Sequence, residues 1–416
     1  MHSSRIFYFL TTLITLTLAD GPRHGKRGYI HPHGPLLTLP HVSASAGVLV
    51  GPHPPHPHPI HGGIGFGGEH VRFDLHTMQQ PNYIQNEFKK LVPVSLENLI
   101  EEEWKAFKLT YGKSYPTDEV ERFRREVFIE NRAKIARFNQ EYSKGKTNYV
   151  QQLNPYGDLL NHEFNQLLNG FRQTTANATG AEIPAPTTFI PSANVAIPNG
   201  VDWRQVGAVT GVKSQGACQS CWAFAAAGAL EAAWFRKTGQ LVDVSEQNLV
   251  DCTTEYDNDG CQGGLIDPAF QYIRANNGVD GEEVYPYEGQ DGQCRFKRDG
   301  VVAQCTGYVN IAEGDEKGME IAVSTQGPIA VAIDASREGF QFYSDGIYYD
   351  PECGNGQDDV NHAVLIVGYG QEPNGQKYWM VKNSYGAQWG IGGYIKMAKE
   401  ANNHCGIANQ ATYPLV

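Results

Sequence analysis

All eight cysteines of this 416-residue chain lie after residue 217. Disulfides form in oxidising compartments and stabilise folded domains, so this distribution predicts a disulfide framework that belongs to the C-terminal half alone. Spacing by itself does not choose among the connectivities that eight cysteines allow. The chain is too long for one ordinary domain and long enough to bury a large core. The second half is therefore expected to be a cross-linked domain that folds outside the cytosol.

Two of these cysteines stand in the segment Gln215–Trp222, which reads Gln-Gly-Ala-Cys-Gln-Ser-Cys-Trp. Cys221 heads an apolar, alanine-rich run, and a helix that begins there would favour the thiolate, which is the nucleophilic form. The Gln215 amide could donate to an oxyanion forming near that sulfur. A thioredoxin-like redox pair and half of a zinc site are the alternatives for Cys218-x-x-Cys221. Zinc is disfavoured because no second such pair and no nearby histidine accompany it, and the alanine-rich continuation does not resemble a redox domain.

A base for this nucleophile has to come from elsewhere in the chain. Only His162, His362 and His404 lie downstream of residue 80. His362 precedes a continuous apolar run closed by glycines, which indicates a buried strand. A histidine that is merely packed in the core is the alternative for this position. Asn383 follows a second apolar segment and is flanked by aromatic residues, where it could hold an imidazole ring in one orientation.

A helical region precedes these motifs. Trp104, Phe107 and Tyr111 fall at helical spacing. A longer stripe then recurs in steps of three or four residues, which indicates one face of a long helix. Its members are Glu121, Arg125, Phe128, Asn131, Ile135 and Asn139. Such a stripe is also what any amphipathic helix presents to a core.

Taken together, these motifs resemble the papain-like cysteine peptidases, in particular their cathepsin L-like branch, over roughly Trp104 to Val416. The family pattern C-G-[SA]-C-[WY] matches here with Gln219 in place of the glycine. His362 follows Cys221 by 141 residues and Asn383 follows it by 162. The helical stripe matches the ERFNIN signature of the inhibitory propeptide. The segment 152–158 is similar to the family's Gly-x-Asn-x-Phe-x-Asp, with Gln for the glycine and Tyr for the phenylalanine.

The resemblance implies an α+β, papain-like two-lobed fold, with a helical left lobe, a β-barrel-like right lobe and the active-site cleft between them. A small helical propeptide domain and a disordered leader rich in His, Pro and Gly would precede it. The implied ranges are a signal peptide over 1–19, the leader over 20–94, the inhibitory propeptide over 95–172, an exposed activation linker over 173–197 and the peptidase over 198–416.

The resemblance also implies catalytic roles. Cys221 would be the nucleophile, and His362 would stabilise its thiolate, protonate the leaving amine and activate the hydrolytic water. Asn383 would orient the imidazole, and the Gln215 amide would form the oxyanion hole with the backbone N–H of Cys221. The chain would then be a cysteine endopeptidase made as a zymogen and acting through an acyl-enzyme. A catalytically silent homologue used for binding is the alternative, supported only by the unusual residues at 219 and 385.

The resemblance also implies that a substrate pairs with the backbone at Gly263 and Gly264, where glycines permit close approach. A tight turn beside a disulfide is the alternative for these two glycines. The pocket that the resemblance implies is mostly apolar and would favour Leu, Val or Phe at the second residue before the scissile bond. The expected pocket residues are Leu265, Ile266, Ala332, Val360, Ala363 and Gln410, and the remaining expected substrate-binding residues are Asn361 and Trp389. Tyr385 stands where relatives have a Trp that covers the Asn–His hydrogen bond.

The resemblance further implies the disulfides Cys218–Cys261, Cys252–Cys294 and Cys353–Cys405, which leaves Cys305 as a buried, inert thiol. Asn177-Ala-Thr is the one N-glycosylation sequon found, and it lies in the expected linker. No metal and no cofactor are expected in the peptidase. The leader holds ten of the 14 histidines, so weak metal binding there is an alternative to a simple solvated segment.

Residues 198–416 carry 28 acidic and 14 basic side chains, which argues against nucleic acid as a partner and suggests release of the propeptide by acid. A short charged start, an apolar stretch over 6–18 and small residues before Asp20 are typical of a secretory signal peptide. That stretch is too short to span a bilayer, so no stable membrane insertion is expected. The expected partners are protein and peptide substrates and the chain's own propeptide. The expected state is a lysosomal or extracellular monomer.

Overall fold

The computed structural model describes residues 63–66, 69–72, 96–172, 187–192 and 195–416. The expected signal peptide, the proline-rich stretch over 51–61 and the sequon at Asn177 lie outside the described residues. The chain divides into two compact units, residues 1–113 and 114–416, and each is described on its own. No helix in the described ranges is both long enough and apolar enough to cross a bilayer.

The described residues of the first unit form a short hairpin and one helix. Strands β1 (Gly63–Phe66) and β2 (Glu69–Arg72) pair antiparallel, although the leader was expected to lack regular structure. No proline stands between residues 63 and 72, and the intervening Gly-Gly has the composition of a tight hairpin turn. Helix α4 (Leu96–Tyr111) buries Trp104 and Phe107, whose rings stack 5.6 Å apart, as the helical spacing predicts.

The second unit begins with the elements of the expected propeptide. They are α5 (Asp118–Ser143), β3 (Tyr149–Gln151) and α6 (Asn161–Leu168). Thr117 caps α5 by accepting a hydrogen bond from the N–H of Val120, which satisfies one of the free donors at the helix start. Two asparagines of the predicted stripe then attach the following chain to α5. Asn131 donates to the carbonyls of Gly157 and Leu159, and Asn139 exchanges two hydrogen bonds with the backbone of Gln151.

One lobe of the peptidase is helical and packs around α7 (Cys221–Thr238), in which nearly every residue of the first three turns is buried. Its small side chains allow a close approach to the sheet, because a Cβ at Gly228 would meet Leu365 at 2.8 Å. Gly239 ends α7 in the left-handed conformation that glycine adopts without strain. The other elements of this lobe are α8 (Glu246–Cys252), η1 (Thr254–Tyr256), η2 (Gly260–Gln262), α9 (Ile266–Ala275), β6 (Val279–Asp280), η3 (Arg298–Gly300) and β7 (Val301–Ala303).

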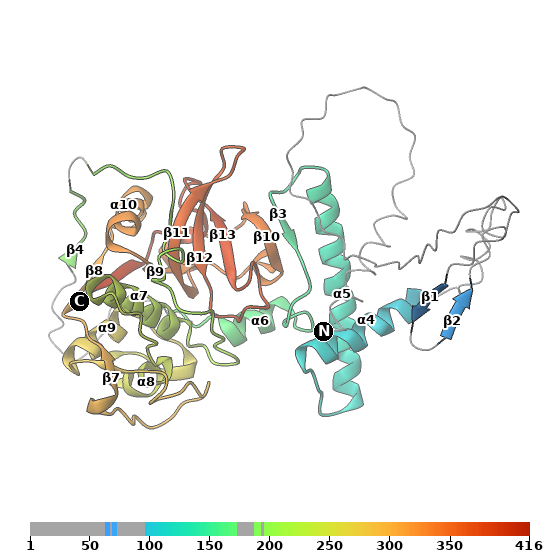
Figure 1. Ribbon diagram of the computed structural model, residues 1–416, viewed down its shortest axis with the longest axis horizontal. Helices are drawn as coiled ribbons and strands as arrows, with labels where there is room; N and C mark the ends of the chain where they lie inside the picture. Colours follow the sequence, from blue (N-terminus) through green and yellow to red (C-terminus); the bar gives the residue numbers. More distant parts are fainter. Residues whose placement is uncertain (1–62, 67–68, 73–95, 173–186, 193–194) are drawn as a thin grey trace, which may run out of the picture. The chain divides into compact units, whose positions relative to one another are not determined.

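The other lobe is a ten-stranded sheet with its own hydrophobic core. The strand order is β3-β10-β13-β12-β11-β9-β14-β8-β4, with β5 paired to β11. Figure 1 shows α7, α8 and α9 grouped beside these strands. The strands are β4 (Thr187–Thr188), β5 (Val201–Asp202), β8 (Gly307–Asn310), β9 (Ile329–Ile333), β10 (Tyr343–Tyr348), β11 (His362–Gln371), β12 (Lys377–Lys382), β13 (Tyr394–Ala398) and β14 (Ala411–Leu415). The helical segments of this lobe are α10 (Glu316–Gln326), α11 (Glu338–Gln341), η4 (Gln357–Asp359) and η5 (His404–Gly406).

Both edge strands of this sheet come from residues that precede the expected peptidase. At one edge, β3 pairs antiparallel with β10, and at the other edge β4 pairs parallel with β8. The strand β4 lies in the segment 173–197, which was expected to be an exposed linker. Its two threonines are solvent-exposed, yet the N–H of Phe189 still bonds the carbonyl of Asn310. The α+β, two-lobed architecture agrees with the expected fold class.

Candidate active site

Cys221 is the first residue of α7, and its side chain is fully buried. The backbone N–H of Ala363, on β11, points at its sulfur at 3.4 Å. Burial raises the pKa of the Cys221 thiol to about 11, although N–H groups of Ala363 and Gly170 oppose the shift. The position therefore offers donors for a thiolate, but in this closed state its lack of solvent keeps the sulfur neutral.

His362 begins β11, as the apolar run predicts, and its Nε2 lies 2.8 Å from Oδ1 of Asn383. Asn383 Oδ1 also accepts the N–H of Ser384, which identifies it as the oxygen and makes the imidazole Nε2 the donor. The other ring nitrogen, Nδ1, has no hydrogen-bond partner in the described part of the chain. A neutral ring in this orientation carries its basic lone pair on Nδ1. Burial lowers the pKa of His362 to about 4, against the upward effect of its bond to Asn383.

Gln215 is buried, with both ends of its side-chain amide engaged. Its Nε2 donates to the carbonyls of Leu168 and Cys218 at 2.9 and 2.8 Å, and its Oε1 accepts the Ser384 hydroxyl at 2.6 Å. Leu168 is the last residue of α6, so a carbonyl from the expected propeptide range 95–172 already occupies the donor expected to stabilise an oxyanion. That occupation does not follow from sequence motifs, because Leu168 and Gln215 are 47 residues apart.

The segment Gly170–Arg172 pairs with the expected substrate-binding backbone. The N–H of Gly264 donates to Gly170 O at 2.9 Å, and the N–H of Arg172 donates to Gly264 O at 3.0 Å, in a parallel bridge. The N–H of Phe171 bonds the carbonyl of Asn361 at 3.0 Å on the opposite side. A Cβ added to Gly263 would lie 2.6 Å from Gly170 O, so only glycine permits this approach.

Gly170 itself has no space for a side chain, because a Cβ there would overlap the backbone oxygen of Gln219. The side chain of Gln219, the unusual residue of the cysteine motif, donates to the carbonyl of Gln166 on α6. Arg172 adds a bridge at 2.8 Å to Asp259 and two hydrogen bonds to the carbonyl of Gln262. The chain thus approaches Cys221 so closely that it leaves the sulfur no access to a substrate.

Phe171 lines a cavity of about 340 Å³ together with Leu265, Ile266 and Gln410. The expected pocket residues Ala332, Val360 and Ala363 do not line this cavity, but all three belong to the hydrophobic cluster that contains Phe171. Polar groups also line it, which the sequence did not indicate. They are Asp257, Asp267, Gln271, Asn310, Glu313, Asn409 and Thr412. The Gln410 amide donates to Gln357 Oε1 at 2.8 Å, so this polar residue is already paired.

Aromatic rings enclose the histidine. Tyr385 stacks on the His362 ring with 4.7 Å between centroids and 29° between planes, and Phe340 approaches it edge-on at 6.1 Å. Trp389, which was expected to bind substrate, is fully buried and donates its indole N–H to backbone carbonyls of α11. In this state the rings exclude solvent from the bond between His362 and Asn383.

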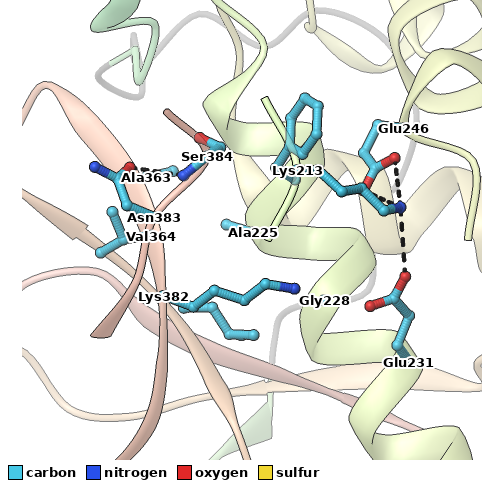
Figure 2. A pocket seen from close by; sticks show the side chains of 12 residues that line it. Lys213, Ala225, Gly228, Glu231, Glu246, Ala363, Val364, Lys382, Asn383 and Ser384 are labelled. Carbon is cyan, nitrogen blue, oxygen red and sulfur yellow. Dashed lines mark hydrogen bonds and ion pairs between the residues drawn. The ribbon is translucent and has the colours of Figure 1, made fainter. Parts of the chain in front are cut away.

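A buried cluster of charged residues lies behind these groups, and its members were not singled out from the sequence. Figure 2 shows the Lys213 ammonium between two carboxylates, 2.7 Å from Glu246 and 3.7 Å from Glu231. Burial alone would lower the pKa of Lys213, but Glu246 and Glu231 raise it above its usual value. Lys213, Glu231 and Glu246 line a small cavity. Lys382, which directly precedes Asn383, also lines this cavity and donates to the Thr210 hydroxyl. The cluster connects α7, α8 and β12 beside Asn383 and Ser384.

Three disulfides are present, Cys218–Cys261, Cys252–Cys294 and Cys353–Cys405, and they are the pairs that the resemblance implied. Cys221 and Cys305 are free and buried. The cysteine pair in the Gln215–Trp222 segment is therefore not a redox pair, because Cys218 is bonded to a distant cysteine beside Gly263. Among the described residues, one group has the spacing of metal ligands, and its two cysteines are already joined in a disulfide.

Comparison with known proteins agrees with this geometry. Residues 197–415 match the papain family cysteine protease model, and residues 104–164 match the cathepsin propeptide inhibitor domain (I29). The chain belongs to the papain family of cysteine proteases. Within that family it is a cathepsin L-like zymogen, which confirms the expected class of enzyme and its intramolecular inhibition by a propeptide.

Individual relatives are similar to this chain over about three quarters of its length. The chain is 52% identical to cathepsin L of Sarcophaga peregrina over 327 residues, which is 78% of this chain and 95% of that protein. It is 49% identical to procathepsin L of Rattus norvegicus, covering 76% of this chain and 92% of that one. The solved structure of digestive procathepsin L 3 from the Tenebrio molitor larval midgut matches with a TM-score of 0.71 and 41% identity, covering 76% and 99% of the two chains.

Proposed function

We propose that this protease hydrolyses peptide bonds through Cys221, with His362 as its acid–base partner, Asn383 as the orienting group and Gln215 as an oxyanion donor. The hydrogen bond from His362 Nε2 to Asn383 supports this assignment most strongly, because it fixes the ring and leaves Nδ1 as the basic nitrogen. Once the propeptide leaves, solvent returns to the sulfur and the ring. An adjacent imidazolium and the helix start then favour the thiolate.

The reaction follows from these positions. The Cys221 sulfur attacks the scissile carbonyl, and the oxygen that becomes negative accepts hydrogen bonds from Gln215 and from the backbone N–H of Cys221. His362 gives its proton to the leaving amine and then takes one from the water that releases the acyl group. Asn383 keeps the ring in the same orientation through both steps.

The proposed substrate preference is apolar at the second residue before the scissile bond. Phe171 supports it, because this aromatic side chain lines the cavity together with Leu265 and Ile266. Endopeptidase action is proposed, since the chain has no apparent insertion of the kind that closes the cleft in cathepsin B-like relatives. The protein is further proposed to be a monomer.

We also propose a mature peptidase over 198–416 released from a signal peptide over 1–19, a leader over 20–94, a propeptide over 95–172 and a linker over 173–197. Glycosylation at Asn177 would be lost with that linker. Three disulfides support folding in the secretory pathway, with the lysosome or the extracellular space as its destination.

Active-site labelling tests the assignment. After incubation at pH 4.5, the protein is treated with an epoxide inhibitor of cysteine peptidases, digested and mapped by mass spectrometry. We expect one labelled residue, Cys221, and loss of peptide hydrolysis in proportion to labelling. Cys305 is the internal control, because it is the other free thiol and is also buried. Labelling of neither thiol in processed, folded protein would contradict the proposal.

A further inference from the structure

Tyr385 carries a hydroxyl group that the peptidase mechanism does not use. Its ring stacks on His362, and its hydroxyl donates to Oδ1 of Asn169 at 2.8 Å. Burial, together with the nearby Cys221 sulfur, raises the pKa of this phenol well above its ordinary range. The group is therefore a hydrogen-bond donor throughout the pH range in which the protein acts.

The position of Asn169 relative to the nucleophile defines where this donor points. Asn169 directly precedes Gly170, whose backbone N–H faces the Cys221 sulfur, and Phe171 beyond it lines the expected substrate pocket with Leu265 and Ile266. Asn169 thus lies on the side of Cys221 away from that pocket. In a substrate that fills the pocket, this side receives the first residue after the scissile bond.

The carboxamide of Asn169 is held in one orientation by a row of amides on α6. Its Nδ2 donates to Asn165 Oδ1 at 3.0 Å, and Asn165 Nδ2 donates in turn to Asn161 Oδ1 at 3.2 Å. Asn161 Nδ2 reaches Gln341 Oε1, on α11 of the peptidase, at 3.2 Å. These asparagines are four residues apart and share one helix face. Because every amide donates in the same direction, the oxygen of Asn169 is left to face Tyr385.

We propose that the Tyr385 hydroxyl is a specificity-determining group, which favours substrates with a hydrogen-bond acceptor on the first side chain after the scissile bond, and that Asn169 occupies this subsite in the zymogen. Release of the propeptide removes the acceptor. A substrate asparagine restores the hydrogen bond, whereas a leucine of similar shape leaves the donor unpaired. A neutral hydrogen bond of this kind favours the asparagine substrate by about fivefold.

The test compares two internally quenched peptides that are identical except for Asn or Leu at the first position after the scissile bond. Both carry Leu at the second position before it, and mass spectrometry verifies that each is cut at the same bond. We expect the acid-processed enzyme to cleave the Asn peptide with about fivefold higher kcat/KM, and Tyr385→Phe to bring the ratio near one. Lost packing against His362 would lower kcat/KM for both peptides equally and leave the ratio unchanged. A wild-type ratio of one or below, or a ratio retained in Tyr385→Phe, overturns the proposal.

A second measurement applies even where Tyr385→Phe does not fold. Asn169→Leu changes only residues that processing removes, so the mature enzyme keeps its sequence. We expect this zymogen to process several times faster than wild type at pH 5, because the unpaired hydroxyl no longer holds the propeptide. Gln166→Leu is the matched control, since it removes an exposed amide from the same helix. Equal rates for Asn169→Leu and Gln166→Leu contradict the role given to Asn169.

Discussion

At the scale of single residues, the chemistry of the site depends on which neighbours remain after activation. The zymogen surrounds Cys221, His362 and Gln215 with protein atoms, so each group is present but blocked. The thiol and the imidazole are both neutral because burial disfavours their charged forms, while the glutamine amide is occupied by a carbonyl of the propeptide. Inhibition therefore acts on protonation and on hydrogen bonding as well as on access.

Thiol reactivity tests the protonation part of this statement. The pKa of Cys221 near 11 in the zymogen leaves about one thiol in ten thousand ionised at pH 7. We expect iodoacetamide to modify the zymogen at a rate that rises as pH increases toward 11, since deprotonation supplies the nucleophile. The processed enzyme should react much faster at pH 7, and mass mapping should place the label on Cys221. Equal modification rates for the two forms at pH 7 would contradict burial as the cause of the low reactivity of Cys221 in the zymogen.

Gln215 permits a separate test of transition-state stabilisation. Gln215→Ala removes the side-chain donor but leaves the backbone N–H of Cys221, so activity should fall without disappearing. Loss of one such donor lowers kcat by about 10²–10³-fold. The measurement is kcat of processed enzyme, titrated with an active-site label so that only competent molecules are counted. The Cys221→Ala variant gives the background rate of hydrolysis. If kcat of Gln215→Ala were equal to that background, Gln215 would have to do more than stabilise the oxyanion.

At the scale of secondary-structure elements, the propeptide contacts the site through α6 and the segment that follows it. The start of α6 is attached to α5 through Glu163, which accepts from Arg124 at 2.6 Å and from the N–H of Leu160 at 2.9 Å. Burial acts to raise the pKa of Glu163, but these two donors prevail and the pKa lies below its ordinary value of 4.5. The ionised carboxylate thus stabilises the attachment above that value, and the contribution is lost as pH falls through the lower folded pKa.

Glu163→Gln should therefore weaken the attachment at neutral pH and make zymogen processing less dependent on acid. We expect this variant to process faster than wild type at pH 6 and at a similar rate at pH 4. The readout is the fraction of zymogen converted with time on a denaturing gel. Glu119→Gln is the matched control, because it also removes a carboxylate paired with an arginine but on an exposed face of α5. If Glu163→Gln zymogen processed with the pH profile of wild type, the attachment through Glu163 would not determine the pH dependence of processing.

Gly170 tests the tight passage of the chain beside Cys221. A methyl group at this position would overlap the backbone of Gln219, so Gly170→Ala should displace the segment that covers the sulfur. We expect an epoxide inhibitor to label Gly170→Ala zymogen at pH 7 at least several times faster than wild type. Gln166→Ala, on the exposed face of α6, should label at the wild-type rate. If Gly170→Ala also labelled at the wild-type rate, the backbone beside Cys221 would have room for a methyl group, which would contradict the structure.

The sequence predicted these elements unevenly. The start of α7, the strand beginning at His362 and the stripe of α5 follow local patterns, so they could be predicted from periodicity and from motifs. The hairpin β1–β2 and the edge strand β4 could not, since a few extended residues carry little periodic signal. The bond between Tyr385 and Asn169 joins residues 216 positions apart, and no motif specifies such a pair. The buried charged cluster at Lys213 could not be predicted for the same reason. Its members are far apart in the sequence, and no motif distinguishes them from surface charges.

At the scale of the whole molecule, two ion pairs among the described residues connect the propeptide side of the chain to the peptidase. Lys134 meets Glu338 at 2.6 Å, and Arg172 meets Asp259 at 2.8 Å. Each is partly exposed and contributes little by itself. In both pairs the basic side chain precedes residue 173 and the carboxylate belongs to the acidic residues 198–416.

Zymogen incubated at pH 4.5 should process much faster than at pH 7.5, because the attachment through Glu163 loses stabilisation as the pH falls. Conversion is followed by gel electrophoresis together with hydrolysis of a peptide substrate. The Cys221→Ala zymogen, incubated alone, separates processing by the protein itself from processing by a contaminant. Equal conversion at the two pH values would remove acid as the trigger without affecting the assignment as a protease.

Maturation also changes which strand forms one edge of the sheet. In the zymogen β3 covers the outer strand β10, and removal of the residues before 198, as proposed, would take β3 away. The mature enzyme would then present a row of unpaired main-chain donors and acceptors, which is the feature that lets one molecule add a strand to another. The irregular register beside Asp345 would interrupt this row. We therefore expect concentrated mature enzyme to self-associate more readily than the precursor from which it came.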